Sequence, residues 1–166
     1  MAAVSSFDVT STVDLQEVDN AVNQARKEIA QRYDFKGSTA SIDFNKAEST
    51  LTLAAEDQMK INALWDVLQT RMVRRNVPIK NLKLGDMETA SGSSVRRVIT
   101  LQQGIPGDAA RDIIKFLKDQ KIKKVQPSIQ GDQLRISSAS KDELQDVIRL
   151  LRGHDFGIDL QFGNYR

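Results

Sequence analysis

The sequence predicts an α+β protein built from two tandem ferredoxin-like halves, each with the order βαββαβ and an antiparallel sheet. Two observations support this fold class. A hairpin followed by an amphipathic helix occurs twice, in residues 129–151 and again in residues 50–69. Each copy lies in one half of the chain. In each half, segments with the two-residue apolar period of strands are interspersed with segments that have the period of about 3.6 residues typical of helices. With right-handed crossovers, this order places both helices of a half on one face of a four-stranded sheet.

The unit in residues 129–151 carries clear turn and capping signals. Gly131-Asp132 separates two short alternating runs, which indicates a hairpin turn. Ser140 precedes the helical pattern and Glu143 follows three residues later, as in a capping box. The apolar stripe of this helix consists of Leu144, Val147, Ile148 and Leu151. The corresponding stripe of the earlier copy consists of Ile61, Leu64, Trp65 and Leu68. We therefore expect Trp65 to be buried.

The first half supplies its elements in the required order. Its predicted strands lie at residues 6–13, 40–44, 51–53 and 82–84, and its helices at residues 14–32 and 57–75. The strands alternate apolar and polar residues, whereas the apolar positions of the helices step by three and four. Asp14 suits the first turn of the first helix, because negative charge favours the positive end of the helix dipole. Pro78 follows the second helix as a stop signal.

The second half repeats this order. Its predicted strands lie at residues 94–101, 125–129, 134–136 and 158–162. Gly104, Pro106 and Gly107 turn the chain into a helix that carries Ala110, Ile113, Ile114 and Leu117. Asp108 is expected to cap that helix, so the preceding loop is only a weak signal for anion binding. The helix with the Ser140 capping box and the last strand complete the half.

Residues 86–94, DMETASGSS, are small and polar and form the best candidate for a linker. This position divides the chain into residues 1–88 and residues 89–166, two ferredoxin-like halves. Because both halves begin and end with strands, terminal strands can exchange between them. Alternation assigns the faces of a strand but does not identify its neighbours, so the pattern leaves the exchange open.

Composition limits the class of protein. The chain has 166 residues, a formal net charge of +2 and no cysteine, which excludes disulfides and thiolate metal ligands. Its N-terminus lacks the basic and apolar regions of a signal peptide, and no apolar run is long enough to span a bilayer. These features favour a cytoplasmic protein.

The sequence offers little support for catalysis. His154 is the only histidine, and it lies in a segment that is typical of a surface turn. The acidic residues form no close pair of the kind that hydrolases use, and there is no GxxxxGK[ST] phosphate loop. We therefore predict a non-enzymatic protein with no catalytic residue, metal site or cofactor.

The sheet face away from the helices is the predicted binding surface. It lacks the aromatic pairs with which RNA-recognition modules stack bases. Alternation places polar side chains there, namely Arg96, Arg135, Gln126, Gln130 and Gln161. We expect Arg96 and Arg135 to lie on neighbouring central strands and to converge on one phosphate. An ordinary solvated face, or a face packed against the other half, would show the same pattern.

Two basic clusters are further candidates for phosphate contacts. Lys121, Lys123 and Lys124 follow the third predicted helix, and Arg71, Arg74 and Arg75 end the second. Cations at the end of a helix also stabilise its dipole, so a solvated helix end is the simpler explanation of both clusters.

Several motifs, taken together, resemble the YajQ family and cover nearly the whole chain. They are SFDVTSTVDLQEVDNAV, RYDFKG, WDVLQTRMVRR, ITLQQGI, IQGDQLRI, SKDELQDVIRLLR and LQFGNYR. The resemblance implies a small bacterial cytoplasmic protein with two ferredoxin-like halves that binds nucleotides. It also implies that some relatives are cyclic di-GMP effectors that act with a transcription regulator. No catalytic residue belongs to the family pattern. This chain departs from the family in residues 137–141, which lack the Gly-Lys-Arg type of segment that usually precedes the last helix.

The favoured interpretation is a non-enzymatic protein that binds a nucleotide, a cyclic dinucleotide such as cyclic di-GMP, or short RNA or DNA. The predicted binding residues are Arg96, Arg135, Gln126, Gln130, Gln161, Lys121, Lys123 and Lys124. The alternative is an adaptor that binds another protein through its open sheet faces or edges and has no nucleotide ligand.

Overall fold

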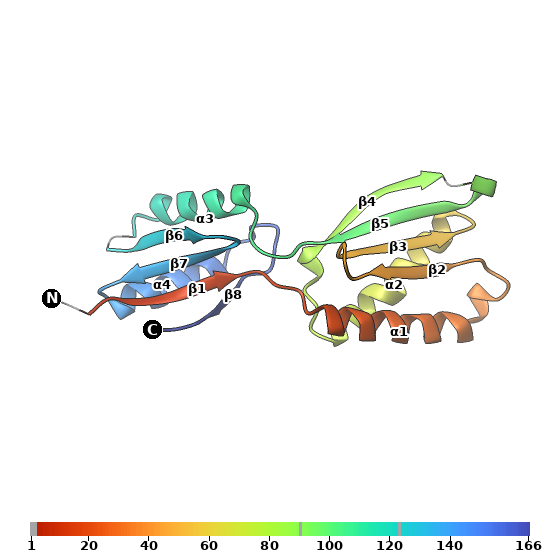
Figure 1. The fold of residues 1–166 in the computed structure, drawn as a ribbon, viewed down its shortest axis with the longest axis horizontal. Coiled ribbons are helices and arrows are strands. Elements are labelled where there is room, and N and C mark those ends of the chain that lie inside the picture. Colours follow the sequence, from red (N-terminus) through yellow and green to blue (C-terminus); the bar gives the residue numbers. More distant parts are fainter. Residues whose placement is uncertain (1–2, 90, 123) are drawn as a thin grey trace. The chain divides into compact units, whose positions relative to one another are not determined.

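The computed structural model describes residues 3–89, 91–122 and 124–166. The chain forms two compact units, each with four strands and two α-helices (Figure 1). Unit 1 combines the chain up to Thr12 with Gln103–Arg166, and unit 2 comprises Val13–Gln102. The predicted fold class is confirmed, because each unit has a four-stranded antiparallel sheet with the strand order of a ferredoxin-like fold.

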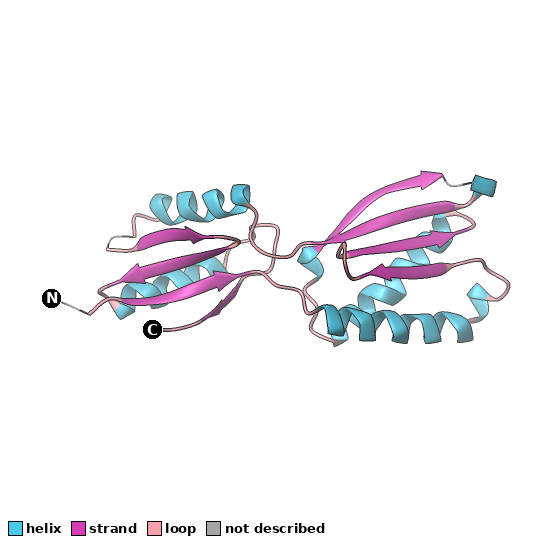
Figure 2. Ribbon diagram, viewed as in Figure 1, coloured by secondary structure: helices cyan, strands magenta, loops and turns pink. Residues whose placement is uncertain are grey.

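Unit 2 is built on sheet B, which has the strand order β2-β3-β5-β4. Its strands are β2 (Ser41–Asn45), β3 (Thr50–Ala55), β4 (Leu82–Thr89) and β5 (Val95–Leu101). The helices α1 (Leu15–Gln31) and α2 (Gln58–Arg74) pack side by side on one face of this sheet (Figure 2). Asp14 and Asp57 cap the two helices, because their carboxylates accept hydrogen bonds from backbone amides of the first turns.

Unit 1 is built on sheet A, which has the strand order β6-β7-β1-β8. Its strands are β1 (Ser5–Thr10), β6 (Gln126–Gln130), β7 (Gln133–Ser138) and β8 (Gln161–Gly163). The helices α3 (Gly107–Asp119) and α4 (Lys141–Arg152) share one core with the sheet. The predicted hairpin and capping box are both confirmed, since β6 and β7 are joined at Gly131-Asp132 and the Ser140 hydroxyl accepts a hydrogen bond from the Glu143 amide.

The first strands of the two halves are exchanged. β1 lies between β7 and β8 in sheet A, whereas β5 lies between β3 and β4 in sheet B. The compact units therefore differ from the expected halves 1–88 and 89–166. The proposed linker at residues 86–94 is wrong, because β4 continues to Thr89 and β5 begins at Val95, so this segment belongs to a hairpin within sheet B. The chain instead passes between the units after Thr12 and after Gln102.

Each unit has its own hydrophobic core. In unit 1, Phe7 and Val9 of β1 pack with Leu134 and Ile136 of β7 beneath α3 and α4. In unit 2, α1 and α2 cover the apolar face of β3 and β5. Trp65 was expected to be buried but is only half-buried at the edge of this core, whereas its stripe neighbours are buried. No α-helix in the described part of the chain is long and apolar enough to cross a membrane.

Candidate functional site

Four of the predicted binding residues share the open face of sheet A. Arg135 lies opposite Ser128 on one side and opposite Asp8 on the other, while its strand neighbours Leu134 and Ile136 point into the core. The same alternation places Gln126, Gln130 and Gln161 on the face of Arg135. The face is therefore polar, as expected.

Arg96 does not belong to this face, and the expected pair of arginines on neighbouring strands is wrong. Arg96 lies on β5 in sheet B, where its Nε bonds the Glu88 carboxylate of β4 at 3.2 Å. Because β1 and β5 are exchanged, the strand beside Arg135 is β1, and the residue opposite Arg135 is Asp8. An acidic residue thus occupies the place where a second arginine is expected from the sequence.

Asp8 and Arg135 form the electrostatic centre of the open face. Asp8 is only 5% exposed, and its Oδ1 accepts a hydrogen bond of 3.0 Å from Arg135 Nε. Its Oδ2 accepts another from the Asn164 side chain at 2.6 Å. The hydrogen bond from Arg135 is the main reason that the pKa of Asp8 is lowered, and the charge of Arg166 lowers it further. Arg135 is therefore engaged by a carboxylate rather than free for a phosphate.

Gln161 and Gln130 are also occupied by neighbouring groups. The Gln161 side chain bonds the amide, the hydroxyl and the carbonyl of Thr12, with the hydroxyl at 2.7 Å. It therefore fixes the chain just beyond the end of β1, where the chain leaves unit 1. Gln130 donates a hydrogen bond to Ser128 on its own strand. Both amides therefore bond other groups of unit 1.

The predicted lysine cluster lies between α3 and β6. Lys121 and Lys124 are exposed and have positive φ angles of 57° and 65°. Lys123 falls outside the described residues. Lys124 lines a hollow of about 410 Å³ together with Gln126, so the structure brings these two predicted residues together. We call this the lysine hollow; Val4, Val125 and Ser137–Ala139 complete its lining.

Two residues of the second basic cluster, Arg71 and Arg75, have a structural role in unit 2. Arg71 of α2 forms an ion pair with Glu28 of α1, and Arg75 pairs with Glu17 of α1 at 3.3 Å. These arginines thus bridge the two helices. This arrangement explains them without a phosphate ligand.

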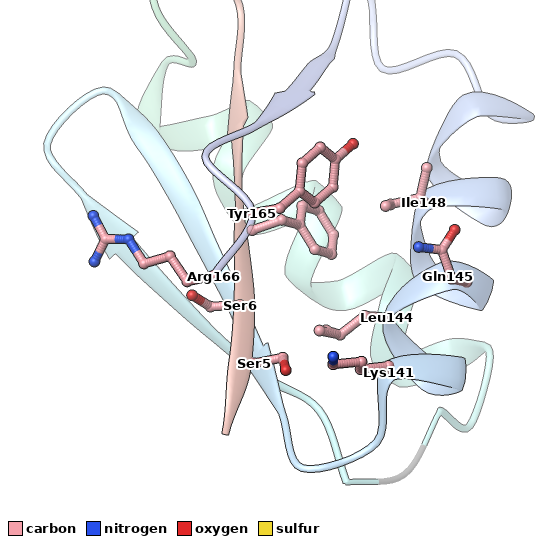
Figure 3. Close-up of a pocket in the computed structure, with 9 residues that line it drawn as sticks. Ser5, Ser6, Lys141, Leu144, Gln145, Ile148, Tyr165 and Arg166 are labelled. Atoms are coloured by element: carbon pink, nitrogen blue, oxygen red, sulfur yellow. The ribbon is translucent and has the colours of Figure 1, made fainter. Parts of the chain in front are cut away.

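A hollow of about 340 Å³ lies between α4 and the C-terminal tail of unit 1 (Figure 3). We call it the tail hollow. Its lining comprises Ser5, Ser6, Phe7, Lys141, Leu144, Gln145, Ile148, Tyr165 and Arg166. The four α4 residues are spaced at i, i+3, i+4 and i+7, so the helix presents them on one face. Figure 3 shows three of them, Leu144, Gln145 and Ile148, projecting towards the side of the Tyr165 ring.

A bulge in the tail brings Tyr165 to this hollow. Asp8 pairs with Gly163, and Ser6 exchanges two backbone hydrogen bonds with Arg166, so the tail contains one extra residue between these points. Asn164 absorbs it with a φ of 54°. The Tyr165 ring then lies 6.3 Å from the buried Phe7 ring yet stays 61% exposed. The Arg166 side chain extends away from the hollow (Figure 3).

The profile of the family described as "Nucleotide-binding protein YajQ-like" matches residues 5–166. A nucleotide-binding protein of Koribacter versatilis is 49% identical over 164 residues, which cover 99% of this chain and 98% of the relative. A nucleotide-binding protein of Bdellovibrio bacteriovorus is 52% identical over 161 residues, which cover 97% of this chain and 98% of the relative. The chain belongs to the YajQ-like family.

Two residues of this YajQ-family chain were missed as site residues by sequence reasoning. Tyr165 lies in the motif LQFGNYR, but the predicted strand ends at residue 162 and alternation gives no warning of the bulge at Asn164. Lys141 was noted only as part of the segment that departs from the family pattern. In the structure, Lys141 lies in the first turn of α4 and lines the same hollow as Gln145. The four-residue spacing of Lys141 and Gln145 predicts that they share a helix face, and this was the available signal.

The tail hollow of this YajQ-family protein combines three kinds of contact. Phe7, Leu144 and Ile148 form an apolar floor, and Tyr165 adds an exposed aromatic face. Lys141 supplies a positive charge in the first turn of α4, which also carries the carboxylates of Asp142 and Glu143. Among the described residues, no His, Cys, Asp and Glu side chains gather in a group that would hold a metal ion.

Proposed function

We propose that this protein binds a nucleotide in the tail hollow of unit 1. The observation that carries the proposal is Tyr165, whose ring is 61% exposed beside an apolar floor and a lysine. Base–aromatic stacking contributes about 1–3 kcal/mol per base, and such a ring is a typical platform for it. The naming of the relatives as nucleotide-binding proteins supports the same class of ligand.

Each side chain of the tail hollow has a role in this proposal. The base stacks on Tyr165, and its edge lies against Ile148 and Leu144, which are buried residues that line the hollow. The Gln145 amide both donates and accepts hydrogen bonds, so it can contact the edge of a base. Lys141 pairs with a phosphate, because it is the residue of the first turn of α4 that lines the hollow with a positive charge.

The size of the hollow suits a mononucleotide, because ligand pockets of small molecules begin at about 300 Å³. A cyclic dinucleotide such as cyclic di-GMP requires a second base and a second phosphate. The lysine hollow offers Lys124 and Gln126 for these groups. Its lining residues Val4 and Ala139 are close in the chain to Ser5 and Lys141, which line the tail hollow. We propose a cyclic dinucleotide as the first ligand to test.

Binding of a nucleotide in the tail hollow involves no catalytic step. The lining of the tail hollow has neither a carboxylate side chain nor an imidazole that would act as a general base. A binding protein of this kind acts by presenting its loaded state to a partner, for which a transcription regulator is a suitable class. We propose a cytoplasmic location for the protein.

The test is a binding titration with mononucleotides, cyclic dinucleotides and a short single-stranded RNA. Tyr165→Ala should weaken nucleotide binding about tenfold, because stacking of one base is lost. Lys141→Gln should weaken it as well and reduce its dependence on salt. The matched controls are Tyr33→Ala and Lys46→Gln, which remove an exposed tyrosine and an exposed lysine of unit 2 and should leave affinity unchanged.

Two outcomes would contradict the proposed site. If Tyr165→Ala binds normally and Arg135→Gln does not, the ligand lies on the open face of sheet A. If the parent protein binds none of the nucleotides but captures a protein, the adaptor interpretation holds instead.

A further inference from the structure

Unit 1 has a third hollow, of about 370 Å³, beside α3 and the C-terminal end of α4. We call it the histidine hollow. His154 stacks on Phe116 of α3 with ring centroids 4.5 Å apart and an interplanar angle of 30°. Phe156 lies against both rings, at 4.6 Å from His154 and 5.5 Å from Phe116. Three aromatic rings from two segments thus form one continuous patch beside the hollow, and His154 is exposed to solvent.

The charges around this patch are mainly negative. Asp112 and Asp119 lie seven residues apart on α3, on the same side as Phe116, and Asp155 follows His154. Lys115 is the one basic residue of the lining, so three carboxylates face one ammonium group. In the described part of the chain, neither Asp112 nor Asp119 forms an ion pair. Their charges are therefore available to a ligand.

The aromatic patch and the carboxylates together determine which class of ligand fits the histidine hollow. Aromatic faces attract cations, and carboxylates do so more strongly. The same carboxylates repel phosphates, which makes the histidine hollow unsuitable as a second nucleotide site. A guanidinium group fits best, because it is planar, stacks on rings and donates several hydrogen bonds, whereas an ammonium group is compact and strongly hydrated.

We propose that the histidine hollow binds an arginine side chain presented by a partner protein. The guanidinium lies on the ring of His154 or Phe156 and donates hydrogen bonds to Asp112 and Asp119. This surface uses other residues than the tail hollow, so the proposal is independent of nucleotide binding.

The single histidine of the chain provides a direct measurement. Its ring Cε1–H gives one NMR signal, which can be followed while short peptides Gly-Arg-Gly, Gly-Lys-Gly and Gly-Glu-Gly, blocked at both ends, are added at constant pH. We expect a saturable shift with the arginine peptide, a weaker response to the lysine peptide and none to the glutamate peptide. Added salt should reduce the affinity for the arginine peptide.

A charge-neutral variant tests the role of the carboxylates. Asp112→Asn combined with Asp119→Asn should weaken binding of the arginine peptide by at least about threefold, since two exposed charge contacts are lost. Both residues are exposed, so the fold should persist, which circular dichroism checks. The matched control combines Asp66→Asn with Asp86→Asn, two exposed aspartates of unit 2, and should bind as the parent does.

Three results would overturn the proposal: no saturable shift with the arginine peptide, an equal shift with the glutamate peptide, or unchanged affinity in the double variant.

Discussion

At the scale of single residues, Asp8 determines the character of the open face of sheet A. It is almost fully covered, yet its two carboxylate oxygens accept hydrogen bonds from Arg135 and Asn164. A buried carboxylate requires such partners, because an unpaired buried charge is costly. The same contacts join strands from distant parts of the chain, since Asp8 lies on β1, Arg135 on β7 and Asn164 in the tail. Asp8 therefore couples the exchanged strand to the sheet that receives it.

Asp8→Asn should lower the free energy of unfolding of unit 1 by about 1–3 kcal/mol at neutral pH, because Arg135 loses its carboxylate. The pKa of Asp8 is lowered in the folded state, so its contribution is fully present above the ordinary value of 3.8 and is lost as the pH falls through the lower folded value. In urea unfolding, the difference in the free energy of unfolding between the parent and the variant should therefore shrink as the pH falls below 3.8. Asp43→Asn, at an exposed aspartate of β2, is the control and should change little. A constant difference down to strongly acidic pH would contradict this account.

The candidate residues could be predicted only in part from the sequence. Alternation placed Arg135, Gln126 and Gln130 on one face, because the two-residue period follows from strand geometry alone. It could not identify Asp8 as the neighbour of Arg135, since strand pairing depends on distant parts of the chain. The position of Tyr165 beside the core could not be predicted for a different reason. A one-residue bulge at Asn164 reverses the sheet faces that alternation assigns to the residues after it.

At the scale of elements, local signals with a defined mechanism were reliable. The Ser140 capping box and the Gly131-Asp132 turn each depend on a few neighbouring residues, and both are present. The loop before α3 differs from expectation, because Pro106 occupies the capping position and Asp108 bonds the amide of Ala109. Gly104 in that loop is held by tertiary contacts: its amide bonds the Ser11 carbonyl at 2.6 Å, and it packs against Asp132.

Gly104→Ala should therefore destabilise unit 1 more than a glycine substitution in an open turn. Gly104 has a φ of 82°, and an added Cβ would lie 2.7 Å from the Cβ of Asp132. Gly131 is the matched control, because it has a φ of 65° and nothing within 4 Å of an added Cβ. Gly131→Ala should cost about 1–2 kcal/mol for its backbone conformation. Gly104→Ala should cost roughly 1–3 kcal/mol more for the steric overlap. Equal losses in urea unfolding would show that Asp132 moves away freely.

At the scale of the whole molecule, the exchange of β1 and β5 was the feature that the sequence left open. Both strands hold the same place in the βαββαβ order, and either could fill the centre of either sheet on the basis of its apolar face. The repeat thus predicts two ferredoxin-like units but leaves open which first strand completes which unit. In the exchanged arrangement, a unit with contiguous residues exists only for Val13–Gln102. Unit 1 must assemble from both ends of the chain.

Fragments of the chain test this arrangement directly. Residues 13–102 contain α1, α2 and all four strands of sheet B, so this fragment should fold alone and unfold cooperatively in urea. Residues 1–88 lack β5, the strand between β3 and β4, and carry β1 without its partners β7 and β8. That fragment should not fold cooperatively. Trp65 is the only tryptophan and packs at the edge of the core of unit 2, so its fluorescence reports on both fragments. A cooperative transition for residues 1–88, together with its absence for residues 13–102, would mean that the strands are not exchanged.

A synthetic peptide of residues 3–12 added to residues 103–166 should restore a folded unit 1, because β1 is the strand that sheet A lacks in that fragment.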